Sequence, residues 1–123
     1  MYLAVYGQQE LDVAASYNNM GSVYYSQGQY ERALEYYQKS LDIKIRVVGH
    51  EHLDVAASYN NMGRVYDSQG HYERALEYHQ KSLDIKIRVV GHEHPLVADS
   101  KYNLALLHKK RSRKTSWADA LFL

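Results

Sequence analysis

The histidines are the residues of this chain whose type and spacing come nearest to a chemical site. Among seven His, two identical triplets, His50-Glu51-His52 and His92-Glu93-His94, carry side chains of the kind that bind zinc, copper or nickel. Each triplet stands between two helical stretches, and the two are too far apart along the chain to share one ion. Neither triplet alone supplies the three or four converging ligands of a stable site. We therefore interpret them as turn or helix-cap residues, and we expect no metal and no cofactor.

Catalytic motifs are equally missing from the sequence. It contains no nucleophile paired with a base, no glycine-rich phosphate loop and no carboxylate pair with an evident cleft. Ser26 and Ser68 stand near glycines, which turn chemistry alone explains. We predict that the protein is not an enzyme.

The composition is that of one ordinary globular domain. The 123 residues are 46% hydrophobic and 24% charged, with a formal net charge of +1. Cysteine is absent, which removes disulfides and thiolate metal sites and suits a reducing compartment. Since there is neither a basic leader nor an apolar run of ~20 residues, we expect a cytoplasmic protein without membrane contact.

Internal repetition determines how the chain must be organised. Residues 11–52 and 53–94 align without gaps at a period of 42 residues, and they differ at four positions only. The four differences are Ser22/Arg64, Tyr25/Asp67, Gln29/His71 and Tyr37/His79. We interpret the two segments as repeat 1 and repeat 2 of a single repeat domain.

Partial units flank these two repeats. Gly7 matches Gly49, so residues 1–10 are expected to hold the end of a preceding helix and a turn. Residues 95–123 form a partial, degenerate repeat 3, in which the segment starting at Trp117 resembles the start of a second helix. We therefore expect a turn before Trp117. Both ends favour an excerpt of a longer array, with apolar surface left uncapped.

Apolar residues recur at helical spacing within each repeat. In repeat 1 they predict one helix before Gly28 and a second, longer helix that ends near Gly49. The faces of these two helices consist of Val13, Ala14, Tyr17, Met20, Gly21 and Tyr24, and of Tyr30, Ala33, Leu34, Tyr37, Leu41, Ile45 and Val48. Each repeat is therefore an antiparallel helix pair, and such pairs bury both apolar faces only by stacking on one another.

This alternation of large and small side chains resembles a tetratricopeptide repeat. The run is Tyr17…Met20-Gly21…Tyr24…Gly28…Tyr30…Ala33…Tyr37, and the 42-residue period is similar to that of kinesin light chain repeats. The resemblance implies an all-α fold, an α-solenoid of antiparallel helix pairs wound into a right-handed superhelix.

The resemblance also implies a concave groove, lined by the first helix of each pair, in which ligand peptides lie. The matching positions in this chain include Asn18, Asn19, Ser22, Tyr25, Asn60, Asn61, Arg64, Asp67, Tyr102, Asn103 and Leu106. The asparagines either hold a peptide backbone or bond to one another between neighbouring helices. Asp67 stands one turn from Arg64, and we expect the two side chains to pair.

The basic run from Lys109 to Lys114 invites a nucleic-acid hypothesis. It contains no aromatic side chain on which a base could stack. We interpret the run as a solvated turn between helices and expect no nucleic-acid partner.

Two functions fit the whole sequence. The first is a protein–protein interaction scaffold that binds a peptide or partner segment in the groove. The second is a structural module that self-associates into a homo-oligomer, by dimerisation or helix exchange through uncapped ends, around Trp117 and Leu121 among other residues. The partner's identity does not follow from the residues.

Overall fold

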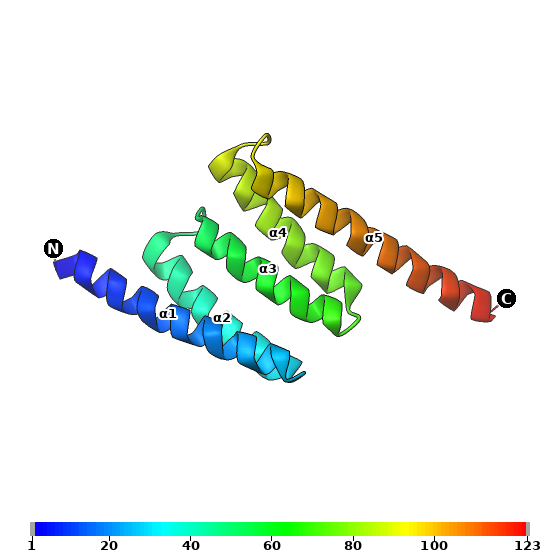
Figure 1. Cartoon of the computed structure of the whole chain (residues 1–123), viewed down its shortest axis with the longest axis horizontal. Coiled ribbons are helices and arrows are strands. Elements are labelled where there is room, and N and C mark those ends of the chain that lie inside the picture. Colours follow the sequence, from blue (N-terminus) through cyan, green and yellow to red (C-terminus); the bar gives the residue numbers. More distant parts are fainter. Residues whose placement is uncertain (1, 123) are drawn as a thin grey trace.

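In a computed structural model, the backbone is described for residues 2–122 and the side chains for residues 5–114. This part of the chain folds into five helices joined by short turns. They are α1 (Tyr2–Ser26), α2 (Tyr30–Val48), α3 (Leu53–Ser68), α4 (Tyr72–Val90) and α5 (Pro95–Phe122). Consecutive helices lie side by side and antiparallel, with α1 at one edge of the array and α5 at the other (Figure 1). Of the helices described, none combines the length and apolar character needed to cross a membrane.

A glycine in the left-handed region makes the turn within each complete pair. Gly28 has φ of 75° and Gly70 has φ of 77°, a conformation that side-chain-bearing residues rarely adopt. Ser112 stands one period after Gly70, so repeat 3 lacks this glycine. Helix α5 accordingly continues to Phe122. The turn expected before Trp117 is therefore wrong, and residues 109–114 belong to a helix.

The expected turn within residues 1–10 is also wrong, because α1 runs through Gly7 without a break. The residues that follow Gly7 are Gln8, Gln9 and Glu10, all good helix formers. One period later, at the end of repeat 1, His52 caps a new helix instead: its Nδ1 accepts a hydrogen bond from the Asp54 N–H at 3.0 Å. A lone glycine costs a helix only about 1 kcal/mol relative to alanine, which is too little to end it.

Within each pair, a helical glycine lets the facing ring approach the backbone. A Cβ built on Gly21 would lie 2.8 Å from the ring of Tyr37, and one built on Gly63 would lie 2.7 Å from the ring of His79. Tyr59 packs on Tyr78 along the same face of α3. The first helix of each pair is therefore held close to the second through small residues.

Helices α3 and α5, the first helices of the second and third repeats, each pack against the preceding helix pair through a second face. We call the four positions on this face the stacking stripe. They are Val55, Ser58, Met62 and Val65 on α3, and Val97, Ser100, Leu104 and Leu107 on α5. All eight side chains are buried. The Lys44 ammonium donates to Ser58 Oγ at 3.1 Å and the Lys86 ammonium to Ser100 Oγ at 2.8 Å, so α2 covers the stripe of α3 and α4 covers that of α5.

Candidate peptide-binding groove

Along one side of the array, the first helix α3 directly contacts both neighbouring first helices, α1 and α5. Asn61 Nδ2 donates to Asn18 Oδ1 at 3.1 Å, and the hydroxyls of Tyr25 and Ser68 are 2.7 Å apart. Farther along, Lys110 of α5 reaches across to Asp67 of α3. The three helices therefore form a continuous surface that carries the groove residues expected from the sequence.

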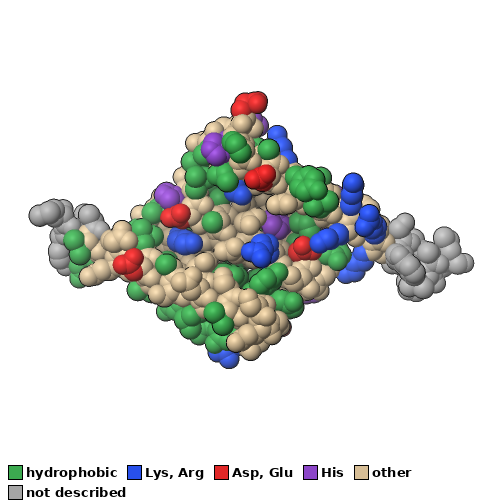
Figure 2. Space-filling view, viewed as in Figure 1, with side chains coloured by type: hydrophobic (Ala, Val, Ile, Leu, Met, Phe, Trp, Pro, Cys, Tyr) green, Lys and Arg blue, Asp and Glu red, His purple; other side chains and the backbone are tan. Residues whose placement is uncertain are grey.

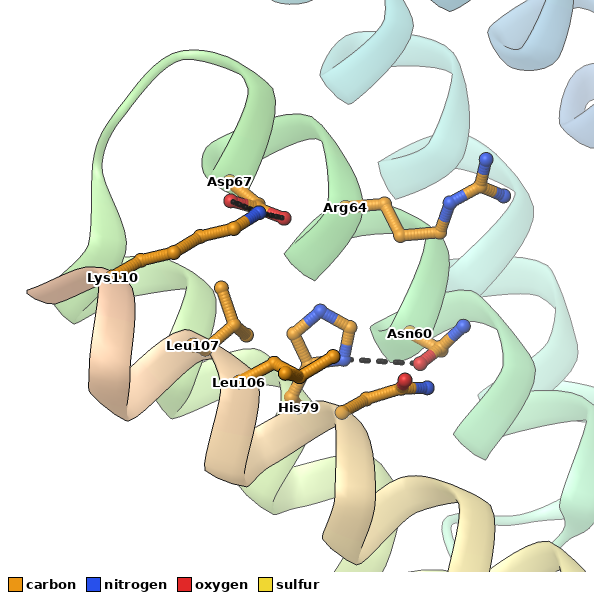
Figure 3. Close-up of a pocket in the computed structure, with 8 residues that line it drawn as sticks. Asn60, Arg64, Asp67, His79, Leu106, Leu107 and Lys110 are labelled. Atoms are coloured by element: carbon orange, nitrogen blue, oxygen red, sulfur yellow. Dashed lines mark hydrogen bonds and ion pairs between the residues drawn. The ribbon is translucent and has the colours of Figure 1, made fainter.

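A pocket opens in this surface between α3, α4 and α5 (Figure 3). Its volume is about 230 Å³. Its lining residues are Asn60, Arg64, Asp67, His79, Asn103, Leu106, Leu107 and Lys110. The His79 ring forms the floor, with the leucines of α5 on one side and polar side chains of α3 on the other. The pocket therefore offers an apolar wall, an imidazole and charges of both signs to a ligand.

His79 is the buried ionisable group of the pocket. Its Nδ1 lies 3.0 Å from Asn60 Oδ1. Because an amide oxygen only accepts, this contact places the proton on Nδ1 and leaves Nε2 as an acceptor. Burial lowers the pKa of His79 below its ordinary value of 6.5, an effect opposed by the Asp67 carboxylate and reinforced by the charges of Lys86 and Arg64. The ring is therefore neutral at pH 7.

The charged pairing at this site differs from the one expected. Lys110 Nζ lies 3.3 Å from Asp67 Oδ1, so the carboxylate pairs with α5. The Arg64 guanidinium lies over the Tyr25 ring, 5.3 Å from its centroid, and points away from the pocket floor (Figure 3). The expected Arg64–Asp67 pair is thus wrong, because a helix one repeat later supplies a closer cation. Arg64 remains exposed and available to a ligand.

The asparagines divide between the two roles considered for them. Asn18 and Asn61 bond to each other, and Asn60 bonds to His79 while also lining the pocket, so these three make contacts between helices. Asn103 lines the pocket and is exposed. Asn19 is exposed on α1, outside the pocket.

Two further expected groove residues lie apart from the pocket. Ser22 is bonded to the Tyr37 hydroxyl at 2.9 Å, at the place in repeat 1 that corresponds to the pocket. Tyr102 is exposed on α5 and does not line the pocket.

Sequence reasoning missed three lining residues, His79, Leu107 and Lys110. His79 was named only as a difference from Tyr37, a residue of an apolar helix face, although this exchange was a signal that the space beside it differs. Lys110 was assigned to a turn because the basic run was not expected to be helical. Leu107 occupies the position of Val65 one period later, in the buried stacking stripe. Nothing in the sequence distinguishes it from residues that only pack in the core.

Three of the four positions at which the two repeats differ meet at this one pocket. Arg64, Asp67 and His79 all line it, where repeat 1 has Ser22, Tyr25 and Tyr37. The fourth difference, Gln29/His71, lies at the turn before the second helix. Figure 2 shows Lys, Arg, Asp or Glu and His side chains close together over the middle of this face.

The basic run holds α5 against the preceding pair. Besides the Lys110–Asp67 pair, Arg111 lies 3.4 Å from Glu73 and Lys114 Nζ donates to the carbonyl of Gly70 at 2.9 Å. Figure 2 shows Lys and Arg side chains gathered over the C-terminal part of α5. The run therefore makes structural contacts to the α3–α4 turn.

The histidine triplets act at helix starts. His52 caps α3, and His94 Nδ1 accepts from the Leu96 N–H at 3.1 Å at the start of α5. The helix-cap interpretation is confirmed for these two residues. Among the described side chains, no three His, Cys, Asp or Glu converge as metal ligands would.

Comparison with known proteins bears on the fold. The model of the tetratricopeptide repeat family matches residues 12–88. The solved structure of BtubC (BKLC) from P. vanneervenii is similar at a TM-score of 0.71 and 26% identity, over 80% of this chain and 39% of that one. A Podosopora anserina protein, described as a kinesin light chain with nearly identical TPR-like repeats, gives a TM-score of 0.69 and 23% identity, over 84% of this chain and 49% of that one.

This chain thus spans less than half the length of either structure. Among curated proteins, none matches it. The predicted α-solenoid of antiparallel helix pairs and its likeness to kinesin light chain repeats are confirmed.

Proposed function

Because the chain belongs to the tetratricopeptide repeat family, whose repeats generally mediate protein–protein interaction, we propose that it binds a segment of a partner protein along α1, α3 and α5. One side chain of that segment enters the pocket above His79. The protein acts as a scaffold in the cytoplasm and not as an enzyme.

The observation that carries this proposal is the convergence of the repeat differences on the pocket. Apart from Tyr37/His79, the buried positions of the two repeats are identical, whereas Arg64, Asp67 and His79 replace three residues at one place. In repeat 1 the Tyr37 hydroxyl and Ser22 bond across this place. In repeat 2, His79 and Arg64 stand in place of this bonded pair, and the Arg64 side chain points away from the pocket floor. This exchange of a bonded pair for a pocket favours a ligand-binding site.

The charges of the pocket favour an acidic ligand. Asp67 is paired with Lys110, and His79 is neutral at pH 7, so Arg64 is left as the cation without a carboxylate partner among the pocket residues. Leu106 and Leu107 add an apolar wall. The preferred segment therefore places an apolar or aromatic side chain beside an Asp or Glu, and its affinity falls as salt increases.

A peptide array that varies acidic and aromatic content, probed with the purified chain, identifies a binding sequence. Fluorescence anisotropy then compares wild type with the double variant Arg64→Ser/His79→Tyr, which recreates the bonded pair of repeat 1. We expect this variant to bind at least about tenfold more weakly, a loss of roughly 1.4 kcal/mol.

His71→Gln is the matched control, because it also restores a residue of repeat 1 but lies outside the pocket. Its affinity should stay within about twofold of wild type, as expected for a position that makes no contact with the ligand. Equal binding by wild type and the double variant refutes the assignment of the pocket.

A further inference from the structure

Among the described residues, no helix covers the stacking stripe of α1, whereas the stripes of α3 and α5 are both covered. Its positions are Val13, Ser16, Met20 and Val23, the same residue types as on α3. Their apolar members are 47%, 40% and 55% exposed, whereas Val55, Met62 and Val65 of α3 are 0%, 2% and 0% exposed. One residue pattern is thus covered on α3 and uncovered on α1.

The internal repeat identifies what covers such a stripe. On α3 the cover is α2, whose Leu41, Ile45 and Val48 pack in the same core cluster as Val55. On α5 the cover is α4, which differs from α2 at a single residue. Both buried stripes therefore contact the same helix sequence.

A polar contact sets the register in both cases. The Lys44 ammonium bonds to Ser58 Oγ, which itself donates to the Asp54 carbonyl at 3.3 Å, and the Asp54 carboxylate lies near enough to act on Lys44. On α1, Ser16 Oγ donates to the Asp12 carbonyl at 3.2 Å in the same arrangement. The acceptors for a lysine are therefore already placed on the open stripe.

From this correspondence we propose that the stacking stripe of α1 binds an amphipathic helix with the residue pattern of α2, including a lysine that reaches Ser16 and Asp12. This surface is separate from the peptide pocket. Binding reproduces the α2–α3 contact one repeat earlier in the array.

Charge favours this occupant over α1 of a second copy. Helix α1 contains Glu10 and Asp12 but no Lys or Arg, so two α1 helices face to face would oppose like charges and leave Ser16 without a lysine. The other edge of the array is different in character. On α5 the face that corresponds to Tyr59 and Tyr66 of α3 carries Lys101 and His108, which are exposed and polar. The described part of this face of α5 is thus polar, whereas the uncapped apolar surface expected near the start of the chain lies on α1. The side chains of Trp117 and Leu121, expected to form a second apolar end, lie outside the described residues.

The test uses a fluorescent peptide of residues 29–49, titrated into the full chain and followed by anisotropy. We expect saturable binding that weakens at least about tenfold in Val13→Glu/Val23→Glu, because charge on the stripe opposes apolar burial. A matched control is Val89→Glu on α4, a valine that is 44% exposed and lies outside the stripe. This control should bind as wild type does.

The peptide itself provides a second readout. Lys44→Gln in the peptide should lower affinity by about tenfold, since the charged hydrogen bond to Ser16 is lost. A photo-crosslinker at that position should label α1 near Ser16. Labelling of Ser58 would mean that the peptide displaces α2, and it would overturn the proposal.

Two other results also contradict it. Equal affinity for wild type and Val13→Glu/Val23→Glu would show that the peptide binds elsewhere. Concentration-dependent dimerisation that these substitutions abolish, with no peptide binding to the chain at low concentration, would assign the stripe to a second copy. Circular dichroism of each variant confirms that the helices are retained.

Discussion

Alanine at Gly21 should destabilise the protein, although alanine normally strengthens a helix. Replacement of an interior helical glycine by alanine usually stabilises by about 0.5–1 kcal/mol. At Gly21 the new Cβ would lie 2.8 Å from two carbons of the Tyr37 ring. Tyr37 is buried and its hydroxyl is bonded to Ser22, so the ring cannot withdraw without losing that bond.

The expected size follows from these opposing effects. Overpacking in a core costs about 1–3 kcal/mol, which exceeds the helix gain and leaves Gly21→Ala less stable by about 1–2 kcal/mol. Gly63→Ala should lose less, about 0.5–1 kcal/mol, because His79 borders a pocket into which its smaller ring can shift.

Gly7→Ala is the control for intrinsic helix preference. Gly7 also lies inside α1, but its nearest atom to a new Cβ is Val47 Cγ1 at 3.6 Å, an ordinary contact. This variant should therefore gain about 0.5–1 kcal/mol. Urea unfolding followed by far-UV circular dichroism measures all three variants. If Gly21→Ala is as stable as Gly7→Ala, close approach of the Tyr37 ring does not constrain α1, and the packing described for the pair is refuted.

Three further predictions concern single side chains. The stability that neutral His79 contributes should be complete above about pH 6.5, the pKa expected in the unfolded chain. It should be lost as the pH falls toward the lowered folded-state pKa of His79, because the unfolded chain takes up the proton first. In urea titrations at several pH values, His79→Tyr should remove this part of the pH dependence. Lys110→Ala should cost less than about 1 kcal/mol, and the cost should shrink in high salt, because the pair with Asp67 is partly exposed. His52→Ala should lower the unfolding free energy by about 1 kcal/mol through loss of the α3 cap, whereas His50→Ala should leave it unchanged.

The repeat made the fold predictable because it repeats the physical constraints along with the residues. Gly28 and Gly70 mark the turns, and the apolar spacing gives the faces of the helices between them. The ends were mispredicted for the same reason. Similarity to repeat 1 suggested a turn near Gly7, and similarity to repeat 2 suggested one before Trp117. A turn depends on the cap or the left-handed glycine itself, and these are missing at both places.

The sequence predicted which residues lie on the groove surface, but not which side chains they contact. Matching the repeats placed Arg64 and Asp67 on the surface that the first helices share, where the pocket lies. Their partners come from residues 43 positions later and 39 earlier, Lys110 and Tyr25, and no local spacing reveals such contacts. His79 is the instructive case, since one ring exchanged for another in a nearly perfect copy was the only sequence sign that this buried position borders the pocket.

The near identity of α2 and α4 has a consequence for how the chain reaches its fold. The two helices differ at Tyr37 and His79 alone, so during refolding either one presents almost the same surface to α1. A misregistered intermediate in which α4 docks on α1 differs from the native pairing in whether a phenol or an imidazole meets Ser22. Correct sorting then depends largely on chain connectivity, because closing the short loop between α1 and α2 costs less entropy than closing the long one to α4. The order of the helices in the sequence thus selects among pairings that their side chains barely distinguish.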